Sequence, residues 1–501
     1  MKTVFYIFSI LVNVISAFNP GMTASIDWAM LEQAKDVFLP YVLNALNKAE
    51  IPDIAFSSGS GYAKNNTFII MEPAGNTFLR PVATDGSIEF SISNLTAHFG
   101  SDNLHYQKFY VFTANGSLNV EITELSLYIR FKLLEKTLKD GSTVPSIEVL
   151  ESKLNIPPDR LNVTIKGDNF MKCVSDIEFA FNSEYRGVID AAVTRGIKGL
   201  LPPIFDAVVA KQDARSMLFD QVSLDWQISQ APIVNHRSLE IGMKGLFFQT
   251  KAGESGAPPA PPKMPYHDKY TKSEFQVFLS TYVVNSLADT LIKNNQLQFT
   301  LNAKAVPTES PIKLDTTYLD GIFPGLADIY GKDRPVDLQF NILKSNVLTI
   351  GNKERINYQA NTGVKFWVEQ ADGTKDLAID FTVDDLLIDL QVLVFGQQPW
   401  LEAKEIHLGS IIGSSSKIAN FNLTAEVQNI NKLFKEGLPI FNYWFKLQHF
   451  RLPETLFGIF HLSDARINYY NGFLEVAFTP TFIAPSESAF VKPQISQNEN
   501  R

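Results

Sequence analysis

Residues 118–133 read Leu-Asn-Val-Glu-Ile-Thr-Glu-Leu-Ser-Leu-Tyr-Ile-Arg-Phe-Lys-Leu, and this stretch decides the fold class. Apolar residues occupy every second position from Leu118 to Ile122, and a second alternating run extends from Leu125 to Leu133, one position out of phase. A period of two is typical of a β-strand with one buried face. A one-residue change of phase indicates a β-bulge, which bends the strand. The stretch therefore predicts one long, bent strand.

The same pattern occurs again in the second half of the chain. One alternating run extends from Leu377 to Val383 and the next from Leu386 to Leu390. The two changes of phase are 386 − 125 = 261 residues apart. This repeat predicts that each half of the chain builds a sheet around a bent strand.

Amphipathic segments flank the bent strands in both halves, because their apolar residues recur at the i, i+3, i+4 spacing of a helix. We expect helices from about residue 26, from about residue 275 after a capping-box spacing of Thr271 and Glu274, and later in each half. Pro202-Pro203 is expected to end the later helix of the first half, and Gly437 and Pro439 that of the second. The apolar stripes are Ile26, Met30, Ala34, Val37, Phe38, Tyr41 and Ala45; Tyr185, Val188, Ile189 and Ala192; Phe275, Phe278, Leu279, Tyr282, Val283 and Leu287; and Val427, Ile430 and Phe434.

Helix, bent strands, helix and further strands thus occur twice, which predicts an α+β protein with an internal duplication of pattern. The apolar helix stripes have two interpretations. If the helices pack directly on their sheets, the stripes are core; if they stand away, the same side chains line a tunnel. Periodicity alone favours core, because apolar stripes usually are core.

The composition excludes several classes of protein. The chain has 501 residues, of which 45% are apolar and only 19% charged, which excludes a disordered chain. Its net charge of −9 and the lack of a basic half exclude a nucleic-acid-binding protein. None of the seven histidines has the spacing of a helical zinc site, and no Gly-x-Ser-x-Gly motif occurs. We therefore expect no metal, no cofactor and no enzymatic activity.

The chain has the features of an exported protein. Lys2, an apolar run of about a dozen residues and Ser16-Ala17 predict a signal peptide over residues 1–17. We expect an N-terminal domain over 18–250, a Pro-rich linker over 251–268, a C-terminal domain over 269–485 and a polar tail over 486–501. Cys173 is the single cysteine, so no disulfide is available. Asn-x-Ser/Thr sites for glycosylation occur at Asn65, Asn94, Asn115, Asn162 and Asn422.

The chain resembles the family of bactericidal/permeability-increasing protein, lipopolysaccharide-binding protein, phospholipid transfer protein and cholesteryl ester transfer protein. The resemblance lies in the order and spacing of Ile51-Pro52-Asp53 after the first helix, the bent strand of residues 118–133, the strand of residues 239–248, the Pro-rich crossover, residues 384–390, and Gly437-Leu438-Pro439-Ile440. The resemblance implies two pseudo-repeated domains, each a strongly twisted antiparallel barrel-like sheet with two long amphipathic helices, joined by a central sheet into an elongated boomerang. A disulfide typical of that family has no counterpart, because Cys173 has no second cysteine.

The resemblance also changes the interpretation of the helix stripes. It implies that each domain encloses an apolar tunnel for phospholipid acyl chains, lined by the stripes given above. We therefore expect a secreted, non-enzymatic lipid-binding or lipid-transfer protein whose partners are phospholipids or other acyl lipids, with transient contact to membrane surfaces. The alternative is an innate-immunity protein that binds bacterial lipopolysaccharide through a basic patch of Arg130, Lys132, Lys136 and Lys139. The competing interpretation of that patch is a solvated hairpin end.

Overall fold

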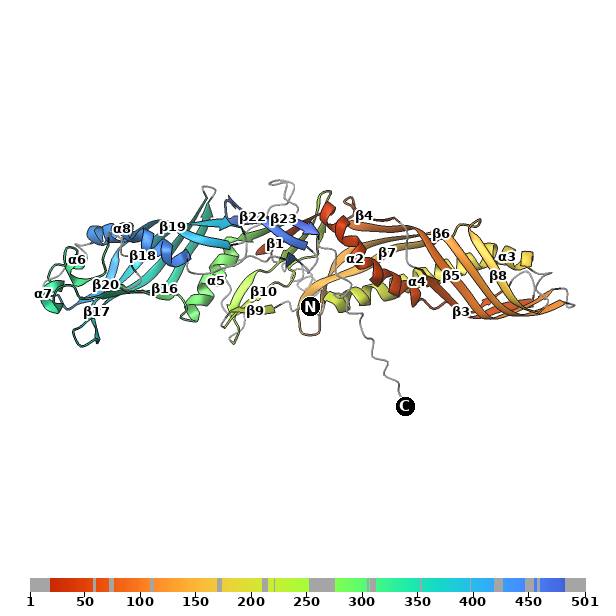
Figure 1. Cartoon of the computed structure of the whole chain (residues 1–501), viewed down its shortest axis with the longest axis horizontal. Coiled ribbons are helices and arrows are strands. Elements are labelled where there is room, and N and C mark those ends of the chain that lie inside the picture. Colours follow the sequence, from red (N-terminus) through yellow and green to blue (C-terminus); the bar gives the residue numbers. More distant parts are fainter. Residues whose placement is uncertain are drawn as a thin grey trace, which may run out of the picture. The chain divides into compact units, whose positions relative to one another are not determined.

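The computed structural model resolves two compact units, which we describe separately (Figure 1). The N-terminal unit comprises Ser25–Asp213 and Ala231–Ile241, and the C-terminal unit takes the described parts of Met1–Ala24, Ala214–Gln230 and Gly242–Arg501. The sequence had suggested one boundary, near residue 250, and those domain limits remain a prediction. The described residues are 19–56, 60–71, 76–108, 112–168, 174–209, 215–219, 221–251, 275–303, 306, 312–351, 354–396, 398–418, 427–446, 455–456 and 460–482.

Several predictions concern residues outside these ranges. The signal peptide, nearly all of the linker, the polar tail, the capping box, Cys173 and Asn422 are among them. The backbone of the first helix is described, but the side chains of Ala34, Val37, Phe38, Tyr41 and Ala45 are not.

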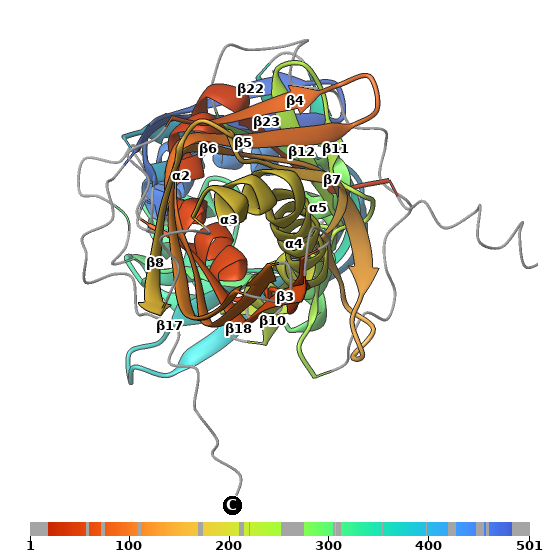
Figure 2. The same cartoon turned by 90° about the vertical axis from the view of Figure 1, so that its right-hand side faces the viewer.

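The N-terminal unit is built on an antiparallel sheet that curls around two helices (Figure 2). Its path is β2-β3-β5-β6-β7, while β4 also pairs with β5 and β8 with β6. The sheet surrounds α2 (Trp28–Asn47) and α4 (Arg186–Val209). The strands are β2 (Ile54–Ala55), β3 (Ser60–Ile70), β4 (Thr77–Val82), β5 (Ser87–Lys108), β6 (Phe112–Thr137), β7 (Thr143–Asn155) and β8 (Leu161–Asp168), and β11 (Ile233–Val234) pairs with β12 (Ser238–Met243).

The C-terminal unit contains a sheet of similar strand order. Its path is β15-β16-β17-β18-β19, and β20 also pairs with β18. In this unit β14 pairs with β23, β23 with β22 and β22 with β21. The helices are α5 (Thr281–Lys293), α6 (Thr316–Asp320), α7 (Leu326–Tyr330) and α8 (Val427–Lys446). The strands of the main sheet are β15 (Gln298–Leu301), β16 (Val336–Gly351), β17 (Arg355–Glu369), β18 (Lys375–Phe395), β19 (Gln398–Leu408) and β20 (Ile411–Ser416). The others are β14 (Phe275–Ser280), β21 (Thr455–Leu456), β22 (Phe460–Tyr470), β23 (Phe473–Phe482), and a small sheet of β9 (Arg215–Phe219), β10 (Val222–Asp225) and β13 (Leu246–Gln249).

Both predicted β-bulges are confirmed. In the N-terminal unit Leu125 pairs with Leu95 and Ile122 with Ala97, so β6 contributes one more residue than β5 between these pairs. Glu124 takes the extra position with a left-handed φ of 55°. In the C-terminal unit the pairs Ala360↔Leu386 and Thr362↔Val383 show the same offset.

Each bulge also marks a change of partner along its strand. Before the bulge, β6 pairs with β8, and after it with β7. Likewise β18 pairs with β20 before its bulge and with β19 after it. The two units therefore use the same strand topology around a bent central strand.

The predicted starts of the first and third helices were wrong. Ile26 belongs to strand β1 (Met22–Asp27), and Phe275–Ser280 form strand β14, so the helices begin at Trp28 and Thr281. At α2 the reason is local, because Asp27 caps the helix by accepting from the backbone N–H of Ala29 at 2.8 Å. At α5 the N-cap residue Ser280 makes no capping hydrogen bond with its side chain, and its hydroxyl instead donates to the C=O of Gly21 at 2.7 Å. Phe275 and Phe278 pair with β23 and lie on opposite faces of β14, and both are buried. Their i, i+3 spacing therefore matches that of a helical stripe although the segment is a strand.

The predicted ends of the later helices were also wrong. Helix α4 continues through Pro202 and Pro203 to Val209, and α8 continues through Pro439 to Lys446. Tertiary contacts hold these last turns and offset the helix hydrogen bonds that proline removes. Asp206 accepts from Ser146 at 2.6 Å, and Asn442 bonds both the N–H and the C=O of Ala403 at 2.7 and 3.0 Å. In the described ranges no helix is long and apolar enough to cross a membrane.

Candidate functional site: two apolar interiors

The interior of the N-terminal unit lies between the inner face of the curled sheet and the helical segment of residues 174–209. That segment consists of α3 (Val174–Ala180), one π-helical turn (Phe181–Tyr185) and α4. Its inward face is fully or almost fully buried at Ile177, Phe181, Tyr185, Ile189, Val193 and Ile197. Sheet residues such as Phe68, Phe99 and Val120 complete the cluster. Alternating strands and a broad apolar helix face therefore enclose one continuous hydrophobic interior.

The structure brings most of the described N-terminal candidates into this unit's interior. Tyr185, Ile189 and Ala192 belong to the cluster, and Val188 packs against it while partly exposed. Met30 on α2 is buried as well, and Ile26 is buried on a strand. Sequence reasoning missed Phe56, Phe99 and Phe181, although the alternation along β5 would have indicated Phe99.

Among the N-terminal candidates whose side chains the structure describes, Tyr185 is the one that carries a polar group. Its side chain is 0% exposed, and its ring lies 5.4 Å from those of Phe181 and Phe56 and 5.8 Å from that of Phe99. Its hydroxyl has no hydrogen-bond partner, and Asn182 Oδ1 on the same turn and Arg186 Nε at the start of α4 are also buried without partners. Burial, followed by the charge of Glu184, raises the pKa of Tyr185, so its hydroxyl stays a donor. A π-turn is a recurrent feature of functional sites.

Replacing Tyr185 with Phe tests whether this hydroxyl is unsatisfied. We expect Tyr185→Phe to raise the free energy of unfolding by about 1 kcal/mol, because it removes a buried donor that bonds nothing. Tyr128→Phe is the matched control: that hydroxyl donates to Glu89 Oε1 at 2.8 Å, and its loss should destabilise by about 1 kcal/mol. Urea denaturation of the three proteins gives both values, and a destabilised Tyr185→Phe variant would contradict the assignment.

The interior of the C-terminal unit contains an apolar pocket beside α8. The cavity has a volume of about 20 Å³, which is room for about one water-sized group. Phe340 of β16 is the centre of its aromatic wall, with ring centroids 4.7 Å from Phe299, 5.6 Å from Phe434 and 5.5 Å from Phe441. The lining residues are Leu301, Ile312, Leu314, Leu338, Phe340, Leu433, Phe434, Gly437, Ile440 and Phe441.

The structure does not gather the C-terminal candidates into one site. Phe434 lines the pocket and Ile430 belongs to the same cluster, while Val427 is half-buried at the start of α8. The candidates before and within α5 belong to other clusters. Tyr282 and Val283 pack with Met22 and Leu246, and Leu279 packs against that group. Phe278 packs with Phe473, Phe275 contacts Phe478, and Leu287 is half-buried.

Helix α5 is buried on two faces, which explains the misassignment. Val284, Ala288 and Ile292 pack on the cluster of β16 and β17. On another face, Ser286 Oγ accepts from the N–H of Phe247, and Thr290 Oγ1 donates to its C=O. A stripe search from residue 275 cannot find this arrangement, because the six strand residues shift the phase.

Carboxylates neutralise part of the predicted basic patch. Arg130 donates to Asp85 at 2.5 Å and to Ser87 at 2.9 Å, and Lys136 forms an ion pair with Asp206. The Ser87 hydrogen bonds and the charge of Arg130 lower the pKa of Asp85, so the pair is charged at neutral pH. These pairs favour the interpretation of a solvated hairpin end.

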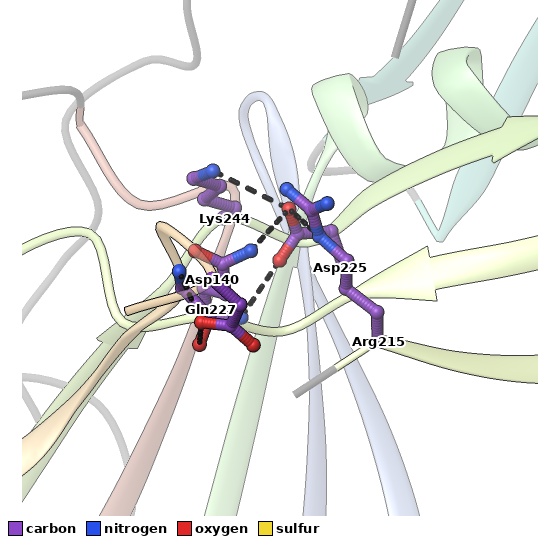
Figure 3. Close-up of polar contacts among 6 residues, drawn as sticks. Asp140, Arg215, Asp225, Gln227 and Lys244 are labelled. Atoms are coloured by element: carbon purple, nitrogen blue, oxygen red, sulfur yellow. Dashed lines mark hydrogen bonds and ion pairs between the residues drawn. The ribbon is translucent and has the colours of Figure 1, made fainter. Parts of the chain in front are cut away.

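The C-terminal unit also buries a carboxylate in a polar cluster (Figure 3). Asp225 is 0% exposed at the end of β10. It accepts from Lys244 Nζ at 3.3 Å, from the backbone N–H of Gln227 at 2.9 Å and from Gln227 Nε2 at 3.2 Å, and Arg215 Nε lies 3.4 Å away. The cluster ties β9, β10 and the segment after β12 together, which is a structural role.

The structure also gives the positions of the predicted glycosylation sites and of possible metal ligands. The four described Asn-x-Ser/Thr asparagines, Asn65, Asn94, Asn115 and Asn162, are all exposed, as an attached sugar requires. Among the described residues, no three His, Cys, Asp or Glu side chains come together as metal ligands would.

Comparison with known proteins identifies a family model that matches this chain. A family model described as the C-terminal domain of the LBP / BPI / CETP family matches residues 218–477, which are 477 − 218 + 1 = 260 of the 501 residues. The chain belongs to the LBP / BPI / CETP family. In this family setting, the two curled sheets with their enclosed helices are the family's mixed α+β fold, mostly sheet with few helices.

The crystal structure of lipopolysaccharide binding protein matches with a TM-score of 0.51 at 16% identity, covering 93% of this chain and 100% of that chain. This likeness shows a shared fold. Takeout 1 of Epiphyas postvittana (11% identity, TM-score 0.27, 37% of this chain and 92% of that one) and P47 of Clostridium botulinum E1 (9%, 0.27, 93% and 100%) are too distant to carry an argument. A search of curated protein sequences found no match to this LBP / BPI / CETP family protein.

Proposed function

We propose that the protein is a secreted, non-enzymatic carrier that holds phospholipid acyl chains in two apolar interiors, one in each unit. The observation that carries the proposal is that each unit of this LBP / BPI / CETP family member encloses an apolar cluster between a curled sheet and a helix. The repeated strand order supports an origin by internal duplication, and the exposed Asn-x-Ser/Thr sites support glycosylation during secretion.

The physical basis is the transfer of hydrocarbon from water into an apolar interior. Each buried methylene contributes about 0.8 kcal/mol, so two acyl chains supply ample free energy. In the C-terminal unit the aromatic rings around Phe340 leave a cavity of about 20 Å³, so an acyl chain enters only when these rings move. In the N-terminal unit, the unpartnered Tyr185 hydroxyl can donate to an ester carbonyl of the cargo.

The number of bound lipids tests this proposal. We expect native mass spectrometry, after incubation with dioleoyl phosphatidylcholine vesicles, to show two lipid-loaded sites per chain. Filling one interior should remove one of them, so Ile189→Trp and Leu433→Trp should each lose one site, because both residues are buried on the inward helix faces. Lys198→Trp and Lys435→Trp are matched controls on the exposed faces of α4 and α8. Absence of lipid from the unmodified protein would contradict the function.

Lipopolysaccharide binding is the weaker alternative. A cationic surface is needed for a phosphorylated sugar head group, and Arg130 and Lys136 are already paired with carboxylates. Lys132 interacts electrostatically with the same Asp85, and Lys139 is exposed at the β6–β7 turn, so nearby carboxylates offset much of the patch's positive charge.

A further inference from the structure

The hairpin of β18 and β19 ends in apolar side chains, of which Phe395 is exposed and Leu393 and Trp400 are half-buried. Phe395 is 64% exposed and its ring stacks on that of Trp400, with centroids 4.4 Å apart and planes at 12°. Trp400 lies directly opposite Leu393, so these three side chains share one face at the hairpin end. A single exposed apolar residue is ordinary, but contiguous apolar side chains at a surface, as here, can mark an interaction site.

Charge is excluded from this end and concentrated behind it. No Asp, Glu, Lys or Arg occurs between Asp389 and Glu402. Glu402 pairs with Lys404 at 2.8 Å, Gln391 donates to Glu354 at 3.1 Å, and Asp389 lies 3.9 Å from Arg355. The rung that joins Gln391 to Glu402 is four rungs from the rung of Phe395 and Gln398, which is about 13 Å at 3.3 Å per residue.

This order of polarity fits a lipid surface better than a protein groove. An element that lies at a membrane interface buries its apolar part about 5–10 Å deep, and Trp prefers the boundary between hydrocarbon and head groups. The uncharged end is long enough for that depth, and the charged residues then lie among the head groups. A protein-binding strand would instead carry its apolar residues along the whole face, whereas Asp389 interrupts this one.

We propose that the β18–β19 hairpin, through Leu393, Phe395 and Trp400, is the surface by which this protein docks on zwitterionic phospholipid membranes to exchange cargo. The proposal rests on the proposed function in one respect: cargo exchange requires the protein to be a lipid carrier. Binding of the hairpin to a membrane does not depend on that function. Net charge of −9 disfavours an electrostatic attraction to anionic membranes, so insertion of aromatic side chains supplies the contact.

Two variants test the hairpin. Phe395→Ser/Trp400→Ser removes both rings, and Gln398→Glu leaves the rings in place but adds a charge at the exposed end. We expect both to reduce co-sedimentation with dioleoyl phosphatidylcholine vesicles at least tenfold and to slow transfer of fluorescent phospholipid between vesicles equally. Ile412→Ser is the matched control, because Ile412 is 61% exposed on β20 of the same sheet, and it should bind as the unmodified protein does.

Binding of monomeric diheptanoyl phosphatidylcholine separates this proposal from the function. It needs no membrane, so the hairpin variants should bind it unchanged. Equal co-sedimentation of the variants and the unmodified protein would overturn the hairpin proposal, as would a Phe395-dependent dimer that binds no vesicles. If the unmodified protein does not bind the monomeric lipid, the carrier function is overturned. The comparison of vesicle co-sedimentation between the unmodified protein and the hairpin variants would still test the docking surface.

Discussion

Asp225→Ala should lower the free energy of unfolding of the C-terminal unit by about 3 kcal/mol, the low end of the range for a broken buried ion pair. The carboxylate is fully buried and accepts three hydrogen bonds, from Lys244 and from the backbone and side chain of Gln227. Its removal takes an acceptor from the backbone N–H and side chain of Gln227 and a neighbouring carboxylate from Lys244 and Arg215. The side chains of Arg215 and Lys244 are 47% and 28% exposed, so water screens part of the loss.

Hydrogen exchange of peptides from residues 221–251 measures this change locally, which matters because two units need not unfold in one transition. Arg160→Ala is the control in the N-terminal unit, and its effect is measured by exchange of the peptides that contain Arg160 and its partner Glu124. Arg160 pairs with Glu124 at 3.1 Å, but both side chains are about half exposed, so its loss should cost less than about 0.5 kcal/mol. Equal effects of the two substitutions would show that the buried cluster carries no special stability.

The sequence was most informative where one local rule determines the backbone. The two phase slips located both bulges, one between Ile122 and Leu125 and one between Val383 and Leu386. This is possible because alternation has a period of two, so a single extra residue moves all following side chains to the opposite face. The α+β class followed from the same patterns and is confirmed by the fold.

The sequence was least informative where tertiary contacts override a local rule. Helices α4 and α8 pass through prolines because Asp206 and Asn442 anchor their last turns to strands far away in sequence. Phe275 and Phe278 satisfy a helical spacing only because β14 is buried on both faces. The pocket beside α8 depends on Phe340, whose role is set by three rings from other elements and has no signature in its own segment.

The candidate site shows the same division. Inward helix residues such as Ile189 and Phe434 could be predicted from spacing, and the structure buries them in their clusters. The stripe of α5 could not be assigned correctly, because that helix packs on β13 by one face and on the β16 cluster by another. The exposed end of the β18–β19 hairpin was missed because the apolar run Val392-Leu393-Val394-Phe395 is typical of an ordinary core strand.

Phe340→Ala should destabilise the C-terminal unit by about 4 kcal/mol, because Phe340 is 1% exposed and contacts three aromatic rings. The cavity beside it then grows from about 20 Å³ by the volume of a benzyl group. Leu343→Ala on the same strand is the control: Leu343 is exposed on the outer face, and its loss should cost less than about 0.5 kcal/mol. Calorimetry gives both values.

Adding lipid to the Phe340→Ala variant tests whether the interior around residue 340 binds lipid or is only a packed core. If the interior is the acyl site, the enlarged cavity accepts hydrocarbon more readily, and phosphatidylcholine should restore part of the lost thermal stability by mass action. At a free lipid concentration 100 times the dissociation constant, that recovery is about 2.7 kcal/mol. A destabilised Phe340→Ala protein that lipid does not stabilise would mean that the rings around Phe340 form only a packed core, and that cargo in this unit binds elsewhere.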